Sequence, residues 1–268
     1  MSTDSSKLHP WALILGASSG FGAATAIALA RDGMNVFGVH LDRKATLPSA
    51  EKVKEDIRQL GREAIFFNIN AADAERRAET LKTAAETLER SRGTVRVLLH
   101  SLAFGTLLPY IGEKPEDRIS PRQMVMTLDV MAHSLVYWAQ DLVCSGLMGR
   151  GGRIFAMTST GGHRVLPYYG AVSAAKAALE SHIRQLAMEL ASRGVTANAI
   201  RAGVTDTPAL RKIPGHELIV STAKGRNPGG RLTTTEDVGK AIAVLCREET
   251  AWVTGNIIGA DGGEDIVG

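Results

Sequence analysis

Short apolar runs alternate with longer segments of helical periodicity along most of the chain, and this alternation restricts the folds that it can adopt. Seven such runs predict buried strands, at residues 11–15, 35–39, 64–69, 95–100, 152–157, 195–200 and 256–259. Helical periodicity covers residues 21–31, 50–60, 74–90, 121–148, 168–192 and 235–247. Because strands that alternate with helices pair in parallel through right-handed crossovers, we expect a single-domain α/β fold, a doubly wound parallel sheet of the Rossmann type.

The chain has no internal repeat and no linker-like tract that would divide its 268 residues. We expect a polar N-terminal tail at residues 1–10 and one domain at residues 11–268. Two long segments, 106–122 and 204–232, interrupt the alternation, and each follows a predicted strand. Because ligands in open α/β sheets bind beyond the carboxyl ends of the strands, both segments should wall a pocket, with 204–232 as its lid.

Composition narrows the classes of function. The formal net charge of +3 comes from 31 basic and 28 acidic residues spread along the chain, so nucleic acid is not an expected partner. No apolar run reaches the roughly 18 residues that a membrane span needs, and the polar stretch at 1–10 does not resemble a signal peptide. Cys144 and Cys246 lie in apolar stretches, which favours buried reduced thiols and a cytoplasmic location. The histidines lack the partner spacing of metal sites, so no metal is expected.

A glycine-rich loop follows the first predicted strand and opens the first predicted helix. It comprises residues 16–22, Gly-Ala-Ser-Ser-Gly-Phe-Gly. In this context a loop presents backbone N–H groups and the positive end of a helix dipole to a pyrophosphate, although a tight connection without a ligand could have the same residues. We therefore predict a dinucleotide site that includes Gly16, Ser18, Ser19, Gly20, Phe21 and Gly22.

The end of the second predicted strand bears on the choice of cofactor. NAD-selective proteins of this fold usually place a carboxylate there to accept hydrogen bonds from the ribose, whereas this chain has His40. Arg43 and Lys44 follow and could bind the 2′-phosphate of NADPH, so we predict NADPH, with NADH as the less favoured cofactor. Asp42 argues against this choice, and an ordinary solvated turn is the alternative interpretation of these charges.

One segment places a tyrosine seven residues before a lysine, Tyr169 and Lys176, at the start of a predicted helix. At about 3.6 residues per turn, this spacing returns both side chains to nearly the same face. The lysine would hold the nicotinamide ribose and lower the pKa of the phenol, which would hydrogen-bond a substrate oxygen while hydride arrives. Tyr168 is the competing donor. Ser159 would orient the substrate or the tyrosine, or else satisfy a turn at the end of a strand.

Together with the glycine loop and this helix, the runs Asn-Ala-Ile-Arg-Ala-Gly at 198–203 and Asp-Gly-Gly at 261–263 resemble the short-chain dehydrogenase/reductase family over nearly the whole chain. Most members have tyrosine four residues before the lysine, where this chain has Val172. The seven-residue spacing instead resembles the bacterial enoyl-acyl-carrier-protein reductases. Enoyl reduction places hydride farther from the protonated oxygen, and moving the tyrosine back three residues shifts its Cα by roughly 4.5 Å along the helix.

The resemblance also implies roles for other segments. The run Leu-His-Ser-Leu-Ala-Phe at 99–104 is similar to one in enoyl reductases, and His100 would pack near the cofactor. Ser159 stands where many enoyl reductases have a second tyrosine, and Met131 stands near the place of the family's relay asparagine. With its mainstream glycine loop, the chain looks most like the NADPH-dependent enoyl reductases. The family's positions imply further cofactor contacts at Asn68, Ile69, Ser101, Leu102, Ala103, Gly203, Val204, Thr205 and Thr207.

These features predict an enzyme that reduces trans-2-enoyl thioesters with NADPH in fatty acid synthesis, the substrate being carried by acyl carrier protein. Tyr169 would stabilise the enolate oxygen, and Lys176 would anchor the ribose. A carbonyl reductase of the same family is one alternative, which Val172 disfavours. A non-catalytic NADP(H)-binding protein is the other, which the retained tyrosine and lysine disfavour. The resemblance also implies a homotetramer built partly through the predicted helices 121–148 and 168–192.

Overall fold

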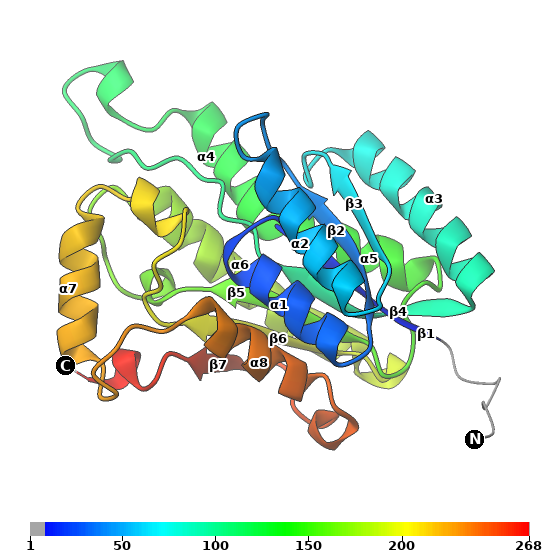
Figure 1. The fold of residues 1–268 in the computed structure, drawn as a ribbon. Helices are drawn as coiled ribbons and strands as arrows, with labels where there is room; N and C mark the ends of the chain where they lie inside the picture. The colour runs from blue at the N-terminus through cyan, green and yellow to red at the C-terminus, as the bar shows by residue number, and fades with distance from the viewer. Residues whose placement is uncertain (1–8, 268) are drawn as a thin grey trace.

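The computed structural model describes residues 9–267, whose fold Figure 1 shows. Seven strands form one sheet in the order β3-β2-β1-β4-β5-β6-β7, and every neighbouring pair is parallel. The strand order reverses between β1 and β4, so the predicted doubly wound α/β fold is confirmed. The strands are β1 (His9–Leu15), β2 (Asn35–His40), β3 (Ala64–Asn68), β4 (Gly93–His100), β5 (Arg153–Thr158), β6 (Thr196–Ala202) and β7 (Ile257–Ala260).

Each strand begins and ends within two residues of its predicted position. The first strand begins at His9, because His9 and Pro10 pair with Gly93 and Thr94 of β4. The tail predicted at residues 1–10 therefore extends two residues too far, and its residues 1–8 lie outside the described part of the chain.

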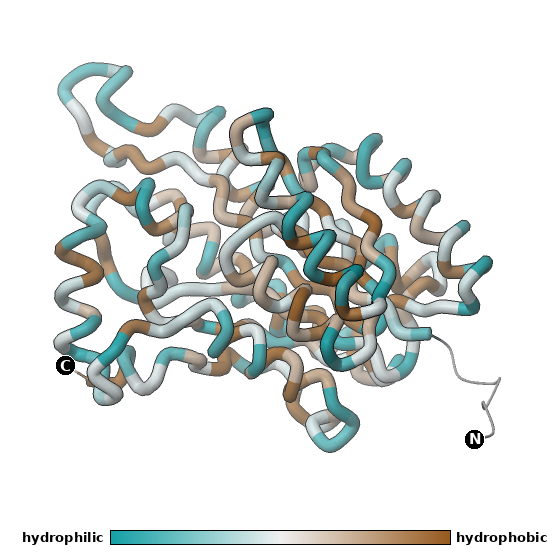
Figure 2. Tube along the Cα trace, viewed as in Figure 1, coloured by the Kyte–Doolittle hydropathy of each residue, from teal (hydrophilic) through white to brown (hydrophobic). Residues whose placement is uncertain are grey.

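Helices cover both faces of the sheet (Figure 1). One face packs against α1 (Gly20–Arg31), α2 (Leu47–Gln59) and α8 (Thr235–Leu245). The other packs against α3 (Ala74–Ser91), α5 (Ser134–Cys144) and α6 (Gly170–Leu190), with α4 (Pro121–Leu128) beside α6. Figure 2 shows apolar strands beneath helices whose outer sides are hydrophilic. The sheet is therefore the shared centre of two apolar cores, which is the arrangement that fixes its carboxyl edge.

Burial decreases toward the edges of the sheet. All residues of the interior strand β5 are buried, whereas β3 is only partly buried and Ile257 in β7 is 38% exposed. The prediction of seven buried strands is therefore wrong for β3 and β7. These strands lie at the two edges, where the helices cover the sheet less completely than at its centre.

The helix predicted at residues 121–148 is two helices joined by a π-helical turn. The first, α4, ends at Leu128, the turn is Asp129–His133, and α5 begins at Ser134. The turn buries three successive side chains, those of Val130, Met131 and Ala132. One face of a regular α-helix does not bury three successive residues, so the wider turn accommodates them. Apolar periodicity continues on both sides of the turn, and for this reason the sequence predicts one continuous helix.

The segment predicted as a lid contains a helix that the sequence pattern does not reveal. This helix, α7 (His216–Arg226), follows a short 3₁₀ turn at Leu210–Lys212. Only Ala223 of α7 is buried, so no apolar stripe marks the helix in the sequence. Thr205 and Asn227, near the two ends of the segment, are buried, so both ends are fixed to the rest of the domain.

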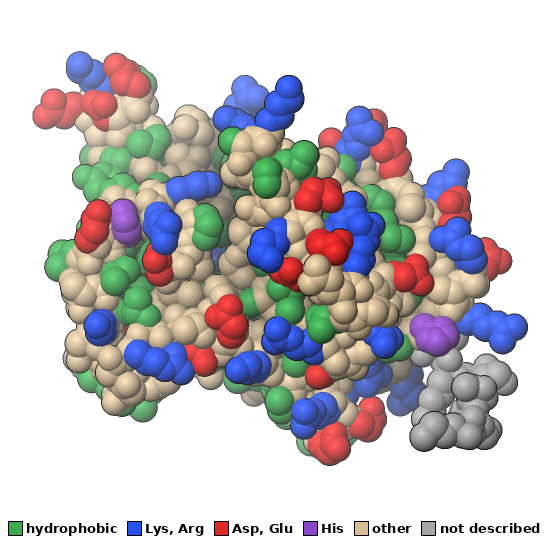
Figure 3. Space-filling model, in the orientation of Figure 1, with side chains coloured by type: hydrophobic (Ala, Val, Ile, Leu, Met, Phe, Trp, Pro, Cys, Tyr) green, Lys and Arg blue, Asp and Glu red, His purple; other side chains and the backbone are tan. Residues whose placement is uncertain are grey.

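The surface bears on partners and location. Acidic and basic side chains are mixed over the face that Figure 3 shows. Within residues 9–267, no helix is long and apolar enough to cross a bilayer. In the same part of the chain, no three His, Cys, Asp or Glu side chains are grouped so as to hold a metal ion. Cys246 is buried but Cys144, the last residue of α5, is exposed, so the prediction of two buried thiols is wrong for Cys144.

Candidate active site

The residues predicted to be functional lie mainly at the carboxyl edge of the sheet. Gly16, Ser101, Ser159 and Gly203 directly follow β1, β4, β5 and β6, and His40 ends β2. Because the strands are parallel, these positions meet at one edge. Open α/β sheets bind their ligands there, so this edge is the candidate site.

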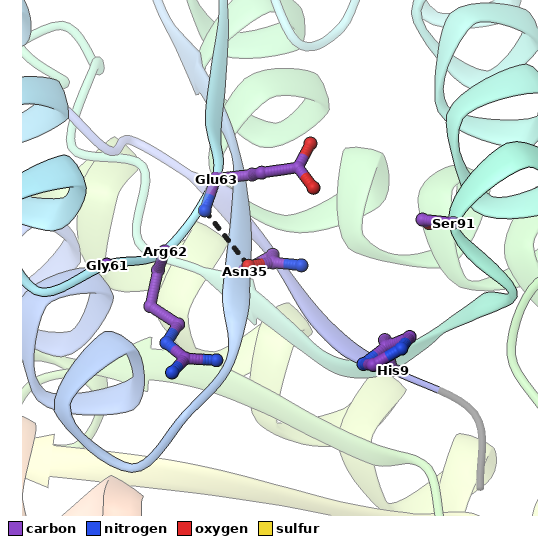
Figure 4. A pocket seen from close by; sticks show the side chains of 6 residues that line it. All are labelled: His9, Asn35, Gly61, Arg62, Glu63 and Ser91. Atoms are coloured by element: carbon purple, nitrogen blue, oxygen red, sulfur yellow. Dashed lines mark hydrogen bonds between the residues drawn. The ribbon is translucent and has the colours of Figure 1, made fainter. Parts of the chain in front are cut away.

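A hollow at the opposite edge, drawn in Figure 4, is not the candidate site. It lies at the amino ends of β1, β2 and β3, where the Asn35 side chain accepts a hydrogen bond of 2.9 Å from the Glu63 N–H. None of the residues predicted to be functional lines it. The residues that do are His9, Asn35, Gly61, Arg62, Glu63 and Ser91.

The glycine loop has glycine at positions where the backbone is packed too closely for a side chain. A Cβ on Gly16 would lie 2.3 Å from the Ser101 carbonyl oxygen, and a Cβ on Gly22 would lie 2.0 Å from the Gly16 carbonyl oxygen. Gly16 and Gly20 also have positive φ angles, of 91° and 57°. Ser19 is the N-cap of α1, and its side chain makes no capping hydrogen bond. The loop and the first turn of α1 therefore form a backbone cradle that fits a pyrophosphate.

Asp42 lies beside this loop and is held from two sides. His40 Nδ1 lies 2.9 Å from Asp42 Oδ2, and the Asn68 amide makes two hydrogen bonds of 2.9 Å with the Asp42 backbone. Burial by itself would raise the pKa of Asp42, but hydrogen bonds from Thr46, Ser18 and His40 outweigh it and lower the pKa. A carboxylate therefore stands next to Ser18 of the glycine loop at neutral pH.

Arg43 and Lys44, predicted to bind a phosphate, are exposed in the turn that follows Asp42. A carboxylate beside the dinucleotide loop accepts hydrogen bonds from ribose hydroxyls and repels a 2′-phosphate. Asp42 is thus a candidate functional residue to which the sequence interpretation gave too little weight. Its position two residues beyond the strand end was the available signal, and its contacts with His40 and Asn68 fix its direction.

Three of the remaining predicted cofactor residues border the glycine loop. The Ser101 carbonyl lies against Gly16, and Leu102 Cδ2 lies 3.6 Å from the place of a Cβ on Gly16. Thr207 Cγ2 lies 3.8 Å from the place of a Cβ on Gly20. The start of the predicted lid and the segment after β4 therefore meet at this loop.

The other predicted cofactor residues do not border the loop in this way. Ala103 is exposed. Phe21 belongs to the loop itself, but its side chain packs against one core. Three of them use a polar group within the fold: Thr205 Oγ1 donates to Gly203 O at 3.0 Å, Ile69 N to His40 O at 2.8 Å, and Val204 N to Glu264 Oε2 at 3.0 Å.

Tyr169 is the N-cap residue of α6 and is only 9% exposed. Its ring packs against Gly161, where a Cβ would lie 2.5 Å from the ring carbon Cε1. Burial raises the pKa of Tyr169, and a hydrogen bond with Ser159 opposes this rise. Tyr168 has a positive φ of 63° and is 48% exposed. The phenol that approaches the turn after β5 is therefore that of Tyr169.

Lys176 lies about two helical turns after Tyr169, on the same face of α6, and approaches the same turn after β5. It is 5% exposed, and its Nζ donates a hydrogen bond of 2.7 Å to the Met157 carbonyl oxygen. Its Cβ lies 3.5 Å from the place of a Cβ on Gly162, the residue that follows the glycine beneath Tyr169. Burial lowers the pKa of Lys176 to about 8, and the charge of Glu180 opposes this shift.

One predicted effect of Lys176 is absent from the protein by itself. The sequence predicts that Lys176 lowers the pKa of Tyr169, whereas burial raises that pKa and only Ser159 opposes the rise. The ammonium is directed to the Met157 carbonyl oxygen, which explains why it has little effect on the phenol.

The lowered pKa of Lys176 predicts how stability depends on pH. The pKa of Lys176 is about 8 in the folded protein and has its ordinary value of 10.5 in the unfolded chain. Between these two pH values, the unfolded chain keeps a proton that the folded protein has lost. The free energy of unfolding therefore rises with pH in this window, by about 3 kcal/mol. Lys176→Met removes this term, so the stability advantage of the variant over wild type should shrink by that amount between the two values.

Chemical denaturation of both proteins at several pH values measures this difference. Subtracting the two curves cancels other groups that titrate in the window, such as Cys246, whose pKa burial raises to about 12. A constant difference between the two proteins across the window would contradict the prediction.

Val172 and His100 pack within the fold beside the site. Val172 is 4% exposed, and its Cγ2 lies 2.8 Å from the place of a Cβ on Gly105, as does the sulfur of Met131. His100 is fully buried, with Nε2 2.9 Å from Ser134 Oγ. Burial, and then the charge of Lys176, lower the pKa of His100 to about 3, so the imidazole is neutral.

Known proteins resemble this chain over most of its length. A family model described as enoyl-(acyl carrier protein) reductase matches residues 16–264. The enoyl-(acyl-carrier-protein) reductase (NADH) FabI of Aquifex aeolicus is 32% identical over 190 residues, 71% of this chain and 69% of that protein. The enzyme of the same name from Buchnera aphidicola is 28% identical over 257 residues, 95% of this chain and 94% of that protein. A structure of the promiscuous reductase LugOII, described as catalysing keto-reduction, has a TM-score of 0.81 at 28% identity, with 96% of this chain and 98% of that chain covered.

The prediction of NADPH as cofactor is wrong. Both curated relatives are named as NADH enzymes. The position of Asp42 supplies the physical reason, because its carboxylate stands beside the dinucleotide loop while Arg43 and Lys44 are exposed. The prediction of an enoyl reductase of this family is confirmed by the family model and by the relatives. The chain belongs to the enoyl-acyl-carrier-protein reductases of the short-chain dehydrogenase/reductase family.

Proposed function

We propose that this enzyme reduces the carbon–carbon double bond of trans-2-enoyl thioesters on acyl carrier protein, in fatty acid synthesis, with NADH as cofactor. The observation that carries the proposal is Tyr169, seven residues before Lys176, packed with it against one turn after β5. Val172, at the usual place of the phenol in carbonyl reductases of this family, is buried in helix packing. Relatives named as enoyl reductases support the same reaction.

Three side chains of this site divide the chemistry between them. The Tyr169 hydroxyl donates a hydrogen bond to the thioester carbonyl oxygen and stabilises the enolate that forms as the β-carbon is reduced. Ser159 directly follows β5 and orients the phenol, whose raised pKa it partly offsets. Lys176 binds the nicotinamide ribose through its ammonium. Because Tyr169 and Lys176 are buried, little water competes for these hydrogen bonds.

NADH fits the cradle at the carboxyl ends of β1 and β2. The glycine loop from Gly16 to Gly22 binds the pyrophosphate through backbone N–H groups, and Asp42 accepts hydrogen bonds from the adenosine ribose. Ser101, Leu102 and Thr207 border this loop and complete the wall of the cofactor site. Bound NADH supplies the hydride for reduction.

Replacing Asp42 should change the choice of cofactor. We expect wild-type kcat/KM for NADH to exceed that for NADPH about 100-fold, because the carboxylate favours ribose hydroxyls over a phosphate. Asp42→Ser should reduce this ratio at least about tenfold. Steady-state kinetics with each cofactor measures the ratio, and Lys44→Ser, at an exposed residue of the same turn, is the matched control. An unchanged ratio in Asp42→Ser would contradict this role.

The lid and the assembly extend the proposal. Segment 204–232 covers the acyl chain of the substrate, since it begins next to the glycine loop and Ile213 packs against a core cluster. The helices α4, α5 and α6 take part in a homotetramer, as the family resemblance implies.

Two thioesters test the reaction itself. Purified protein is mixed with NADH and either a crotonyl or an acetoacetyl thioester, and the loss of cofactor absorbance is followed. Fast loss with the crotonyl thioester alone is the expected result. Turnover of neither substrate, with NADH still bound, would instead favour the non-catalytic binding protein.

Carbonyl reduction is the second candidate. The hydroxyls of Ser159 and Tyr169 can each donate a hydrogen bond to a ketone oxygen. A structural relative is described as catalysing keto-reduction. Cofactor loss with the acetoacetyl thioester alone would favour this candidate over enoyl reduction.

A further inference from the structure

Two successive carboxylates near the end of the chain are buried. Glu264 is 1% exposed, and the side chain of Asp265 is 7% exposed. They follow the Asp-Gly-Gly run and form the 3₁₀ turn Glu264–Ile266, which Figure 1 shows beside α7. Removing a carboxylate from water is costly, and a buried ion pair often adds little to stability. These positions therefore call for an explanation other than the stability of the fold.

Glu264 joins the start of the predicted lid to the helix α7 within it. Its Oε2 accepts a hydrogen bond of 3.0 Å from the N–H of Val204, the first residue of segment 204–232. Its Oε1 lies 3.9 Å from Nη2 of Arg226, the last residue of α7. Gly203 leaves room for this carboxylate, because a Cβ there would lie 2.9 Å from Oε2. One side chain thus connects the start of the lid to the end of α7.

Asp265 joins the turn after β5, Thr160–Gly162, to the sheet through the residues that follow this turn. Its Oδ1 lies 3.0 Å from Arg164 Nε, and its Oδ2 lies 3.2 Å from His163 Nε2 and 3.1 Å from Arg201 Nη1. Arg164 Nη2 also donates a hydrogen bond of 2.6 Å to the Asp265 carbonyl oxygen. His163 and Arg164 directly follow Thr160–Gly162, the turn against which the tyrosine and the lysine pack. Arg201 belongs to β6, so the carboxylate fixes this turn to the strand.

A compact turn directs the two carboxylates. Asp261 accepts hydrogen bonds from the N–H groups of Gly263 and Asp265, at 3.0 and 3.2 Å. Asn227, the residue after α7, donates to the Asp261 carbonyl oxygen at 2.8 Å. Gly263 has a φ of 84°, which a residue with a side chain rarely adopts. The geometry of this turn therefore sends neighbouring side chains to different parts of the site.

We propose that Glu264 and Asp265 form a clasp that positions two walls of the active site. Glu264 holds the start of the lid and the end of its helix α7, and Asp265 holds the loop that supports Tyr169. Neither residue touches the reacting atoms, so both are positioning residues. The proposal rests on the proposed function, because it takes segment 204–232 and the turn after β5 as walls of the substrate site.

The two halves of the clasp make separate predictions, which limited trypsin digestion tests. Glu264→Ala should raise cleavage within the lid about tenfold and leave cleavage at Arg164 unchanged. Asp265→Asn should raise cleavage at Arg164 about tenfold and leave the lid unchanged. Mass spectrometry of early fragments assigns the cuts, and the exposed trypsin sites of the lid are Arg211, Lys212, Lys224 and Arg231.

Two further variants serve as controls. Glu264→Gln keeps an oxygen that can accept from the Val204 N–H, so lid cleavage should stay within about twofold of wild type. Glu248→Ala removes an exposed carboxylate that pairs with Arg96 at 3.3 Å, and it should change neither cleavage. Asp265→Asn keeps the size of its side chain, so its effect on cleavage at Arg164 tests the clasp even if Glu264→Ala folds poorly.

Kinetics provides a readout that a merely structural role would not move. Both clasp variants should raise KM for the enoyl thioester about tenfold, with kcat reduced much less. Equal cleavage in wild type and both variants, or faster cleavage at sites throughout the chain, would overturn the clasp. Failure of wild type to reduce any enoyl thioester would overturn the proposed function, while the cleavage pattern would still decide whether the clasp exists.

Discussion

Tyr169→Phe is expected to lower kcat for reduction of a crotonyl thioester about 10³-fold while leaving the Kd of NADH nearly unchanged. The phenol supplies the hydrogen bond that strengthens as negative charge develops on the thioester oxygen, and phenylalanine keeps the packing against Gly161 without it. Stopped-flow measurement of cofactor oxidation gives the rate, and fluorescence titration gives the affinity for NADH.

Tyr168→Phe is the matched control for this prediction. Tyr168 precedes Tyr169 but is 48% exposed, and its positive φ of 63° lies outside the helical range. We expect its rate to stay within about twofold of wild type. A large loss in Tyr168→Phe with little loss in Tyr169→Phe would reverse the assignment of the proton donor.

Gly22→Ala should abolish measurable NADH binding and lower the free energy of unfolding by about 3 kcal/mol. The added Cβ would lie 2.0 Å from the Gly16 carbonyl oxygen, so the loop or the start of α1 must move. Either movement removes backbone N–H groups from the positions that a pyrophosphate needs. Fluorescence titration with NADH and urea denaturation measure the two effects.

Gly149→Ala is the control for this change. Within the described residues, no atom beyond its two chain neighbours lies within 4 Å of the place of a Cβ on Gly149, so the substitution should alter neither binding nor stability appreciably. Wild-type affinity for NADH in Gly22→Ala would show that the cradle is not the dinucleotide site.

The sequence predicts the sheet well because each strand is a short apolar run bounded by turn residues. Burial on both sides of a central strand imposes such a run, as Arg153–Thr158 illustrates with six buried residues. The tyrosine and the lysine were equally predictable, since helical spacing alone brings Tyr169 and Lys176 to one face. In both cases the determinants are close together in the chain.

Other features depend on contacts between distant segments, which no local pattern contains. The Asp42 backbone is held by Asn68 on the neighbouring strand, and this contact helps to explain the NADH that the relatives' names indicate. The helix α7 has one buried residue, so it lacks the apolar stripe that predicts a helix. No local pattern marks the clasp residues Glu264 and Asp265, because their partners lie in the lid and next to the turn after β5.

The position of transferred hydrogen tests the central claim most directly. NADH that carries deuterium at the transferring position is incubated with the protein and a crotonyl thioester, and the butyryl product is analysed by deuterium NMR. We expect one deuterium at the β-carbon in wild type and almost no labelled product in Tyr169→Phe. Deuterium at the former carbonyl carbon of a ketone substrate, with none in the crotonyl reaction, would contradict enoyl reduction by this site.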